Sequence, residues 1–319
     1  MKGSILFLGT NLCPISIECL SRLLSEDYTI VSVITLKSKK NYFFHWLKED
    51  IITTLLKRQS LAAIAKRASL PYFAIHDINS GYSVSLIRSF QPDIICSCIF
   101  RQKLRQSVIK IPDYGTINIH PSLLPKYRGP DPNFWVFKNG ENITGVTVHY
   151  MDENFDTGDI IIQKSFEIPE GIDMRGLLQS LALISADLAV IAVESIFNKN
   201  TKRLPQINEE YYPSPTKKDY VIDITKDAKS IYNFVKGIKS LSPVLKINNR
   251  EFQIKDAIDY SIVLHEKKIS YKVENNIVYF YAKDGIVRLK LKSFTDTMLE
   301  KLGFHKIINF FQVLMLDLL

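Results

Sequence analysis

The chemically informative residues of this chain are Asn118 and His120, which end an apolar, β-branched run that stops at Pro121. Residues i and i+2 of a strand point the same way, so both side chains should project together from the strand's carboxyl end. Open α/β sheets bind their ligands at that end. An acidic segment, residues 151–159, follows downstream. An amide donor, an imidazole and a nearby carboxylate are what acyl transfer needs when no Ser or Cys acts as nucleophile.

Spacing alone does not choose which carboxylate works with this pair, because Asp152, Asp156 and Asp159 all lie in the acidic segment. A carboxylate beside the imidazole could move a proton directly or through a water. The plainer interpretation is an Asp that caps a turn and a satisfied polar pair at a strand end. A lone Asn-x-His favours that plainer interpretation, so the surrounding motifs must decide.

Residues 1–198 alternate strand and helix signals, which predicts a doubly wound, Rossmann-like parallel sheet of the α/β class. Strands are expected at residues 5–8, 28–35, 72–75, 93–99, 116–119, 145–151 and 160–166. Helices are expected at residues 15–24, 50–68, 83–90 and 173–197. The motif residues would therefore lie at the carboxyl edge of a rigid sheet.

A stretch rich in Pro, Asn and Lys, residues 201–218, predicts a linker between a catalytic domain at 1–200 and a second domain at 219–319. The second domain shows a helix near 227–238 and short β-rich runs at 246–254, 261–264, 277–282 and 287–291, typical of a small OB-like barrel. Asp284-Gly285 is a hairpin turn signal. The apolar tail, residues 307–319, is expected to pack on the body or on a second subunit.

Composition gives bounds on location and partners. No apolar run reaches the roughly 20 residues of a membrane span, and the N-terminus lacks a signal-peptide layout, so we expect a cytoplasmic protein with no membrane partner. The four cysteines do not form a disulfide framework, and Cys96 and Cys98 are expected to be buried thiols rather than metal ligands. Residues 201–319 hold 20 Lys and Arg against 14 Asp and Glu, which suits a polyanionic partner or simply a basic soluble surface.

Several motifs occur in a fixed order within about forty residues: Asn118-x-His120-Pro-Ser-Leu-Leu-Pro125, Tyr127-Arg-Gly-Pro130, Thr144-Gly-Val-Thr147 and Asp156-Thr-Gly-Asp159. This order resembles the folate-dependent formyltransferase family, and the layout is most similar to its methionyl-tRNA members. The resemblance implies transfer of a formyl group from 10-formyltetrahydrofolate to a primary amine, without a metal. Gly9-Thr10 opens no G-x-G-x-x-G or Walker A pattern, so nicotinamide and ATP chemistry are unsupported.

The resemblance also implies roles for individual residues. Asn118, His120 and Asp156 are the implied catalytic residues. The residues implied to bind the reduced folate are Ser122, Leu123, Leu124, Pro125, Phe100, Leu104, Asp152 and Phe155. The residues implied to approach the acceptor are Arg128, Lys37, Lys39 and Lys40.

The acceptor is predicted to be methionyl-tRNA, because the chain has a two-domain layout and a basic C-terminal region. The alternative is a nucleotide-linked amino sugar, since residues 36–48 lack the Pro-Arg and Gly-Arg-Gly elements usual in tRNA enzymes and add four aromatic residues that could stack on a base. Remoter hypotheses are hydrolysis of formyl-folate and folate binding without catalysis. The additional C-terminal domain argues against hydrolysis, because it suits an acceptor larger than water. The set Asn118, His120 and Asp156 argues against folate binding alone.

Overall fold

The computed structural model describes residues 3–37, 60–207, 211–263, 270–293 and 296. Contacts between residues divide the chain into two compact units. The first comprises Met1–Val136, Asn142–Ile168 and Arg175–Ser214, and the second comprises Phe137–Glu141, Pro169–Met174 and Pro215–Leu319. The functional boundaries predicted from the sequence, at residues 200 and 218, stay a prediction.

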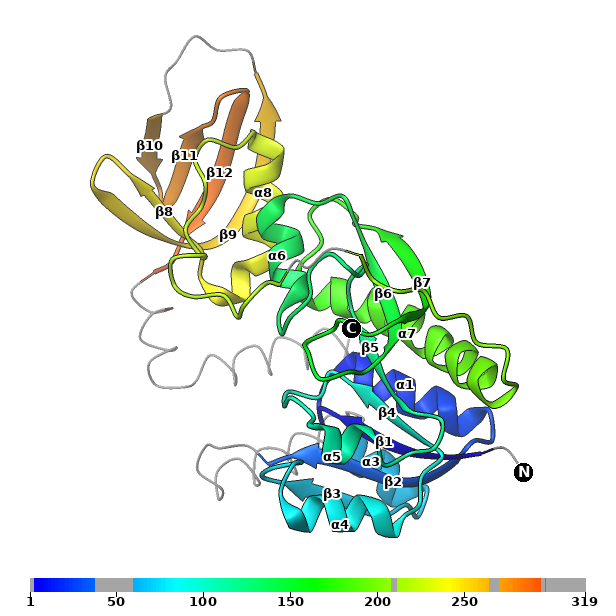
Figure 1. Cartoon of the computed structure of the whole chain (residues 1–319). Coiled ribbons are helices and arrows are strands. Elements are labelled where there is room, and N and C mark those ends of the chain that lie inside the picture. The colour runs from blue at the N-terminus through cyan, green and yellow to red at the C-terminus, as the bar shows by residue number, and fades with distance from the viewer. Residues whose placement is uncertain (1–2, 38–59, 208–210, 264–269, 294–295, 297–319) are drawn as a thin grey trace. The chain divides into compact units, whose positions relative to one another are not determined.

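A seven-stranded sheet forms the centre of the first unit (Figure 1). Its strands are β1 (Ser4–Gly9), β2 (Thr29–Leu36), β3 (Tyr72–Ile75), β4 (Ile94–Cys98), β5 (Thr116–His120), β6 (Ile143–Tyr150) and β7 (Ile160–Glu167). Their order is β3-β2-β1-β4-β5-β6-β7. The first five strands run parallel, whereas β6 and β7 form an antiparallel edge next to β5. The predicted Rossmann-like class is confirmed, with this antiparallel edge added.

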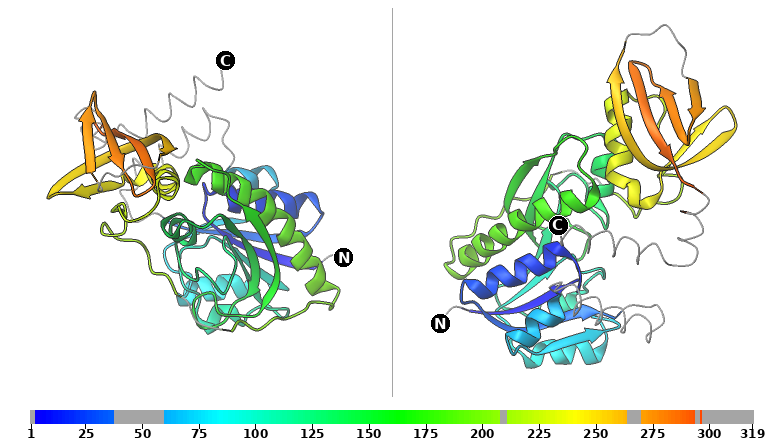
Figure 2. Two further views of the ribbon diagram at one scale, coloured as in Figure 1. Left: turned by 90° about the horizontal axis from the view of Figure 1, so that it is seen from above. Right: turned by 180° about the vertical axis from the view of Figure 1, so that it is seen from behind.

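Helices cover both faces of the sheet (Figure 2). On one face lie α1 (Pro14–Ser25), α3 (Leu61–Arg67) and α7 (Met174–Phe197); on the other lie α4 (Gly81–Ser89) and α5 (Gln106–Ile109). Side chains alternate along β1, so Leu6 and Leu8 pack with Ile87 of α4 and Val108 of α5. A further helix, α6 (Pro132–Asn139), follows the loop after β5. Of these helices, the sequence did not predict α5 and α6.

Helix α7 is long and apolar enough, by length and composition, to cross a membrane. Half of its most apolar stretch is buried inside the protein, and Asp187 on the helix pairs with Arg22 of α1. A core helix of a soluble protein has the same composition, so this feature is weak evidence for a membrane. In the fold, α7 serves as a cover for the sheet.

The second unit contains a curled, five-stranded antiparallel sheet in the order β10-β11-β12-β9-β8. Its elements are α8 (Ala228–Ile238), the 3-10 turn η1 (Lys239–Leu241), β8 (Val244–Ile247), β9 (Arg250–Ile262), β10 (Ser270–Glu274), β11 (Ile277–Tyr281) and β12 (Gly285–Leu291). The single strand predicted at 246–254 is instead a hairpin, because Asn248 and Asn249 both have positive φ angles, 48° and 60°, and turn the chain. The predicted second, smaller β domain is confirmed.

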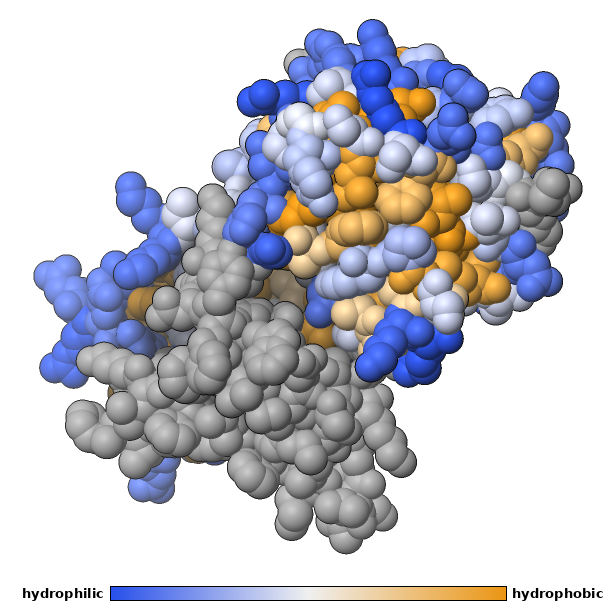
Figure 3. Space-filling view, turned by 90° about the horizontal axis from the view of Figure 1, so that it is seen from below, coloured by the Kyte–Doolittle hydropathy of each residue, from blue (hydrophilic) through white to orange (hydrophobic). Residues whose placement is uncertain are grey.

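The surface in Figure 3 is mainly hydrophilic at its edges, and apolar residues gather in one patch on the face in view. The predicted tail at 307–319 lies outside the described residues. Apolar patches of this kind often mark contacts with another surface.

Phe7 tests the importance of the central strand, because it is fully buried in β1. Phe7→Ala should lower the free energy of unfolding of the first unit by about 3–5 kcal/mol, since it leaves a cavity in a close-packed core. Leu183→Ala is the control: Leu183 lies on α7 and is 61% exposed, so its loss should cost less than about 0.5 kcal/mol. Urea unfolding followed by fluorescence measures both, and equal midpoints would contradict the assigned burial.

Candidate active site

Strand β5 holds Asn118 and His120 rigidly, because it pairs with β4 on one side and β6 on the other. In the register with β6, Asn118 faces His149 and His120 faces Thr147. His149 is almost fully buried, with 1% of its surface exposed, as is His120 with 4%. The antiparallel neighbour therefore adds a second imidazole to the pair, which the sequence analysis did not identify.

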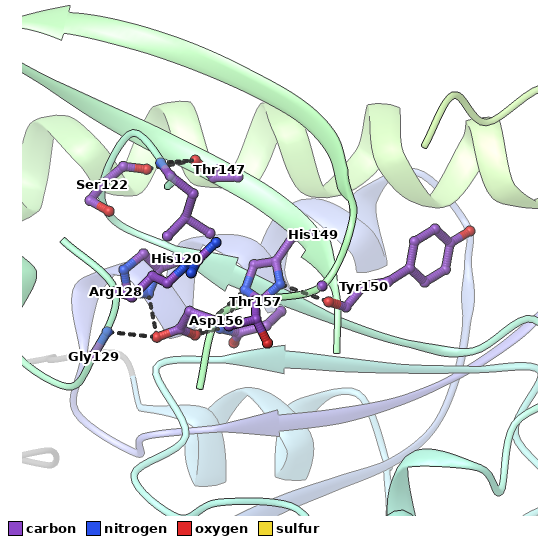
Figure 4. A network of polar contacts seen from close by, with 12 residues as sticks. His120, Ser122, Arg128, Gly129, Thr147, His149, Tyr150, Asp156 and Thr157 are labelled. Atoms are coloured by element: carbon purple, nitrogen blue, oxygen red, sulfur yellow. Dashed lines mark hydrogen bonds and ion pairs between the residues drawn. The ribbon is translucent and has the colours of Figure 1, made fainter. Parts of the chain in front are cut away.

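Asp156 enters the site from the loop between β6 and β7, and four polar groups surround its carboxylate (Figure 4). The Gly129 amide donates to Oδ2 over 2.9 Å, and the Asn118 amide nitrogen donates to Oδ1 over 3.2 Å. Nδ1 of His120 lies 3.7 Å from Oδ2, and Nε2 of His149 lies 3.5 Å from Oδ1. The structure thus brings the three predicted catalytic residues together and adds His149 and Gly129.

These contacts keep Asp156 ionised. Burial alone would raise the pKa of this carboxyl group, because a charge is poorly solvated there. The His120 and His149 imidazoles and the Gly129 amide outweigh burial and hold the pKa of Asp156 well below its ordinary value. For His120, burial lowers the pKa and the Asp156 carboxylate only partly offsets that effect. The site is therefore an anion beside an imidazole that is neutral near pH 7 and takes up a proton with difficulty.

Backbone carbonyls fix which imidazole nitrogen carries the proton, since a carbonyl oxygen can only accept. Nε2 of His120 lies 2.9 Å from the Tyr127 oxygen, so neutral His120 carries its proton on Nε2 and presents Nδ1 as a base. Nδ1 of His149 lies 2.7 Å from the Tyr150 oxygen, so its Nε2 accepts from the Asn118 amide over 3.3 Å. The Asn118 amide nitrogen thus has two acceptors, Nε2 of His149 and Oδ1 of Asp156, and they orient this nitrogen toward the site.

A cavity of about 460 Å³ opens at these residues, within the size range of small-ligand pockets. Asn118, His120 and Asp156 lie on its wall. Of the predicted folate residues, four line the cavity: Phe100, Leu104, Asp152 and Phe155. The binding roles predicted for these four stay a prediction that agrees with their position.

The segment Ser122–Pro125 directly follows Pro121, which lines this cavity, but the segment itself does not line it. It is bonded internally instead: Ser122 donates to the Lys126 carbonyl over 3.0 Å, and the Leu124 amide donates to Thr147 over 3.1 Å. Its predicted contact with the folate stays a prediction.

The predicted acceptor residues are placed differently from one another. Arg128 is buried, with 3% exposed, and its guanidinium donates to the Gln206 side chain. Lys37 is exposed at the end of β2. Lys39 and Lys40 lie outside the described residues, as does most of the 36–48 loop.

The predicted linker also contributes to the site. Tyr211 and Ser214 line the cavity, and Gln206 reaches the Asp156 loop. Sequence reasoning missed these residues because a Pro-rich, polar stretch reads as a connection. His149 could have been found only from the antiparallel pairing of β5 with β6, which places it opposite Asn118 and places Thr147 opposite His120.

Cys96 and Cys98 are fully buried on β4, as predicted, and burial raises the pKa of both thiols well above the ordinary value. In the part of the chain that the structure describes, no group of three His, Cys, Asp or Glu side chains is arranged to hold a metal ion.

Residues 4–192 match the family model described as formyl transferase. The chain belongs to this formyl transferase family. Methionyl-tRNA formyltransferase of Clostridioides difficile strain 630 is 34% identical over 236 residues, 73% of each chain. The enzyme of the same name from Acetivibrio thermocellus is 31% identical over 236 residues, covering 73% of this chain and 72% of that one. The resemblance found in the motifs is confirmed, and the protein is a formyltransferase.

Solved structures confirm the fold of this formyltransferase. WlaRD, a sugar 3N-formyl transferase solved with dTDP and 5-N-formyl-THF, superimposes with a TM-score of 0.64 at 22% identity, covering 91% of this chain and 98% of that one. An N-formyltransferase from Helicobacter canadensis, in complex with folinic acid and dTDP-3-aminofucose, gives 0.64 at 19% identity, covering 92% and 100%.

The contact between Asp156 and His120 gives a measurable prediction. Asp156→Asn removes the carboxylate that raises the pKa of His120 while burial remains, so the pKa of His120 should fall further below its ordinary value. NMR titration of the imidazole signals measures this, with His120→Gln identifying the His120 signal among the six histidines. Asp159→Asn is the control, because Asp159 lies in the same loop but does not act on His120. An unchanged or higher pKa in Asp156→Asn would contradict the geometry.

Proposed function

We propose that this formyltransferase moves the formyl group of 10-formyltetrahydrofolate to the primary amine of methionyl-tRNA. The observation that carries the proposal is the convergence of Asn118, His120 and the ionised Asp156 on the wall of one cavity. An acyl transfer between two nitrogens needs an oxyanion donor and a proton carrier in one place, and these residues supply both.

The reaction exchanges one carbon–nitrogen bond for another. The acceptor amine attacks the formyl carbon, which passes through a tetrahedral oxyanion; the bond to folate N10 then breaks as the new amide forms. The amine loses one proton and N10 gains one, so no oxidant or reductant is needed. In this proposal the protein supplies charge stabilisation and proton transfer.

Asn118 and His120 would stabilise the developing oxyanion. Both hydrogen bonds of the Asn118 amide nitrogen are long, 3.2 and 3.3 Å, so one can be exchanged for a stronger bond to the oxyanion. His120 would take the proton of the amine on Nδ1 and become an imidazolium that Asp156 stabilises. From there the proton would pass to the leaving nitrogen, directly or through a water.

The cavity wall supports a reduced folate as donor. Phe100, Leu104 and Phe155 offer apolar surfaces against which a flat pterin can pack. The loop at residues 152–156 offers backbone groups beside them for the polar edge of the ring. WlaRD and the Helicobacter canadensis enzyme were each solved with a formyl-folate or folinic acid, which supports this class of donor.

Methionyl-tRNA as the acceptor is supported by the curated relatives, which carry that activity in their names at 30–34% identity over about three quarters of the chain. The surplus of basic residues after position 200 is consistent with a polyanion. A cytoplasmic location accompanies this proposal, because aminoacylated tRNA is used there.

A nucleotide-linked amino sugar is the second candidate, and one observation favours it. Phe155 and Tyr211 stand 45% and 51% exposed at the cavity, with ring centroids 5.8 Å apart. Two accessible rings beside a site can stack on a single base without many phosphate contacts. The solved structures with dTDP or a dTDP-sugar are consistent with such an acceptor.

Catalysis should depend on the polar group rather than on the fold. Asn118→Ala and His120→Ala should each lower kcat by about 10²–10⁴, the range for loss of an oxyanion donor or of a proton carrier. Asp156→Asn should do likewise and flatten one limb of the pH–rate profile. Each variant should still bind a stable formyl-folate analogue, which calorimetry measures. Near-normal turnover in two of the three, with the true acceptor, would remove the mechanism; absence of folate binding in the wild type would remove the donor.

The acceptor can be identified by charge, because tRNA presents many phosphates and a sugar nucleotide only two. With tRNA, apparent affinity should fall steeply with salt, and replacing Lys37, Lys39 and Lys40 with Ala should reduce the salt slope by up to about three units.

Lys110, Lys164 and Lys199, three exposed lysines of the first unit, give the charge-matched control triple, which should keep the slope. A panel of nucleotide amino sugars assayed in parallel decides the alternative: formylation of a sugar with a shallow salt dependence, and none of methionyl-tRNA at low salt, would replace the first choice by the second.

A further inference from the structure

Gln206 makes four hydrogen bonds that connect two loops of the active site. Its side-chain oxygen accepts from Nε and Nη2 of Arg128 over 3.0 and 2.8 Å. Its side-chain nitrogen donates to the backbone oxygens of Asp156 and Gly158 over 3.0 and 2.7 Å. Every polar atom of this amide therefore has partners, and all of them lie on the loops that carry the site.

The backbone that Gln206 holds has an uncommon conformation. Asp156 has a φ angle of 56°, in the left-handed region that few residues with a side chain adopt. A Cβ added at Gly158 would come within 2.0 Å of the Tyr150 oxygen, so the chain passes very close to β6 there. Such a bend persists only where surrounding contacts enforce it, and the two carbonyls at the bend are the ones that Gln206 binds.

The same glutamine joins this bend to the loop after β5. Arg128 is buried and donates to Gln206, and the next residue, Gly129, donates its amide to the Asp156 carboxylate over 2.9 Å. Gly129 itself has φ of 116°, and a Cβ there would meet the Tyr212 oxygen at 2.1 Å. The Asp156 carboxylate is thus bound by the Gly129 amide of one loop, and the Asp156 backbone oxygen is bound by the Gln206 side chain.

Backbone pairing on both sides fixes the position of Gln206. Leu204 exchanges two hydrogen bonds with Ile160 of β7, over 2.9 and 3.0 Å, and the Tyr212 amide donates to the Arg128 oxygen over 2.8 Å. The segment that the sequence analysis interprets as a linker is therefore anchored to the sheet before Gln206 and to the site loop after it.

We propose that Gln206, held by Arg128, is a positioning residue that sets the place of the Asp156 carboxylate against His120. It does not line the cavity and acts through Asp156. This inference rests on the proposed function for its effect on rate, but its effect on the Asp156–His120 contact does not. The role also accounts for Arg128, whose guanidinium is engaged with Gln206 in this structure.

The first experiment compares Gln206→Met with the wild type. Methionine has a similar length but donates and accepts no comparable hydrogen bonds, so the bend should relax and the carboxylate should move away from Nδ1 of His120. The charged or titratable groups that act on His120 are Asp156, which raises its pKa, and His149, which lowers it. NMR titration without substrate should therefore show the pKa of His120 falling toward that of Asp156→Asn.

Gln163→Met is the matched control. Gln163 also donates two hydrogen bonds from its amide, to the Leu124 oxygen and to Thr147, but it does not touch the Asp156 bend. The control should leave the pKa of His120 unchanged. An unchanged pKa in folded Gln206→Met would overturn the proposal whether or not the protein transfers a formyl group.

Gln206→Glu separates positioning from stability. A glutamate can keep the fork of Arg128 as an ion pair, so this variant should fold, but its oxygens cannot donate to the Asp156 and Gly158 carbonyls. Its kcat with the true acceptor, measured well below its melting temperature so that the variant is folded, should fall by about 10- to 100-fold, as for a small misplacement of a reacting group. The two lost hydrogen bonds should also lower the melting temperature. A wild-type kcat in Gln206→Glu would overturn the proposal; a lower melting temperature with unchanged kcat would assign Gln206 a purely structural role and overturn it equally.

Discussion

The site depends on one buried anion, the carboxylate of Asp156. A carboxylate with little access to water is costly unless donors replace its hydration. Here the Asn118 and Gly129 amides donate hydrogen bonds to it, and the His120 and His149 rings lie 3.7 and 3.5 Å away. These groups come from β5, β6 and the loop after β5. Satisfying this one charge therefore fixes the register of β5 with β6 and the path of two loops. The same groups hold the pKa of Asp156 low, so the structural requirement and the charge state that the proposed chemistry needs coincide.

The histidines show how backbone geometry sets chemical roles. Both rings give one nitrogen to a backbone carbonyl, yet with opposite outcomes: His120 exposes Nδ1 and His149 exposes Nε2. The first ring is thereby a base directed at the carboxylate side of the site, and the second is an acceptor that orients the Asn118 amide. Mutual orientation of this kind reduces the reorganisation needed when an oxyanion forms, which is how preorganised donors accelerate acyl transfer.

The sequence predicted what local pattern and motif order encode. Alternation of apolar runs predicted the sheet, and the run ending at His120 predicted that Asn118 and His120 share one side of a strand end; the structure has both on the wall of one cavity. Antiparallel pairing of β5 with β6 joins residues 31 apart, so His149 opposite Asn118 has no local signal. Gln206 was missed for the same reason, since its partners Arg128 and Asp156 lie 78 and 50 residues away. Which Asp approaches the histidine likewise depended on resemblance, because three aspartates occupy one short loop.

The chemistry and the choice of acceptor rest on different kinds of side chain. The polar group around Asp156 is almost enclosed, and each member has a partner whose loss would disturb the others, so these positions tolerate little change without loss of the site. Phe155 and Tyr211 are half exposed on the same cavity. In the described part of the chain, no hydrogen bond or ring contact of Phe155 or Tyr211 involves the Asp156 carboxylate. Substitution at such positions can alter which molecule is held at the cavity while the proposed proton carrier and oxyanion donors stay in place. A single catalytic arrangement can therefore serve a tRNA or a sugar nucleotide, and the identity of the acceptor must be sought at the rim of the cavity rather than in its polar group.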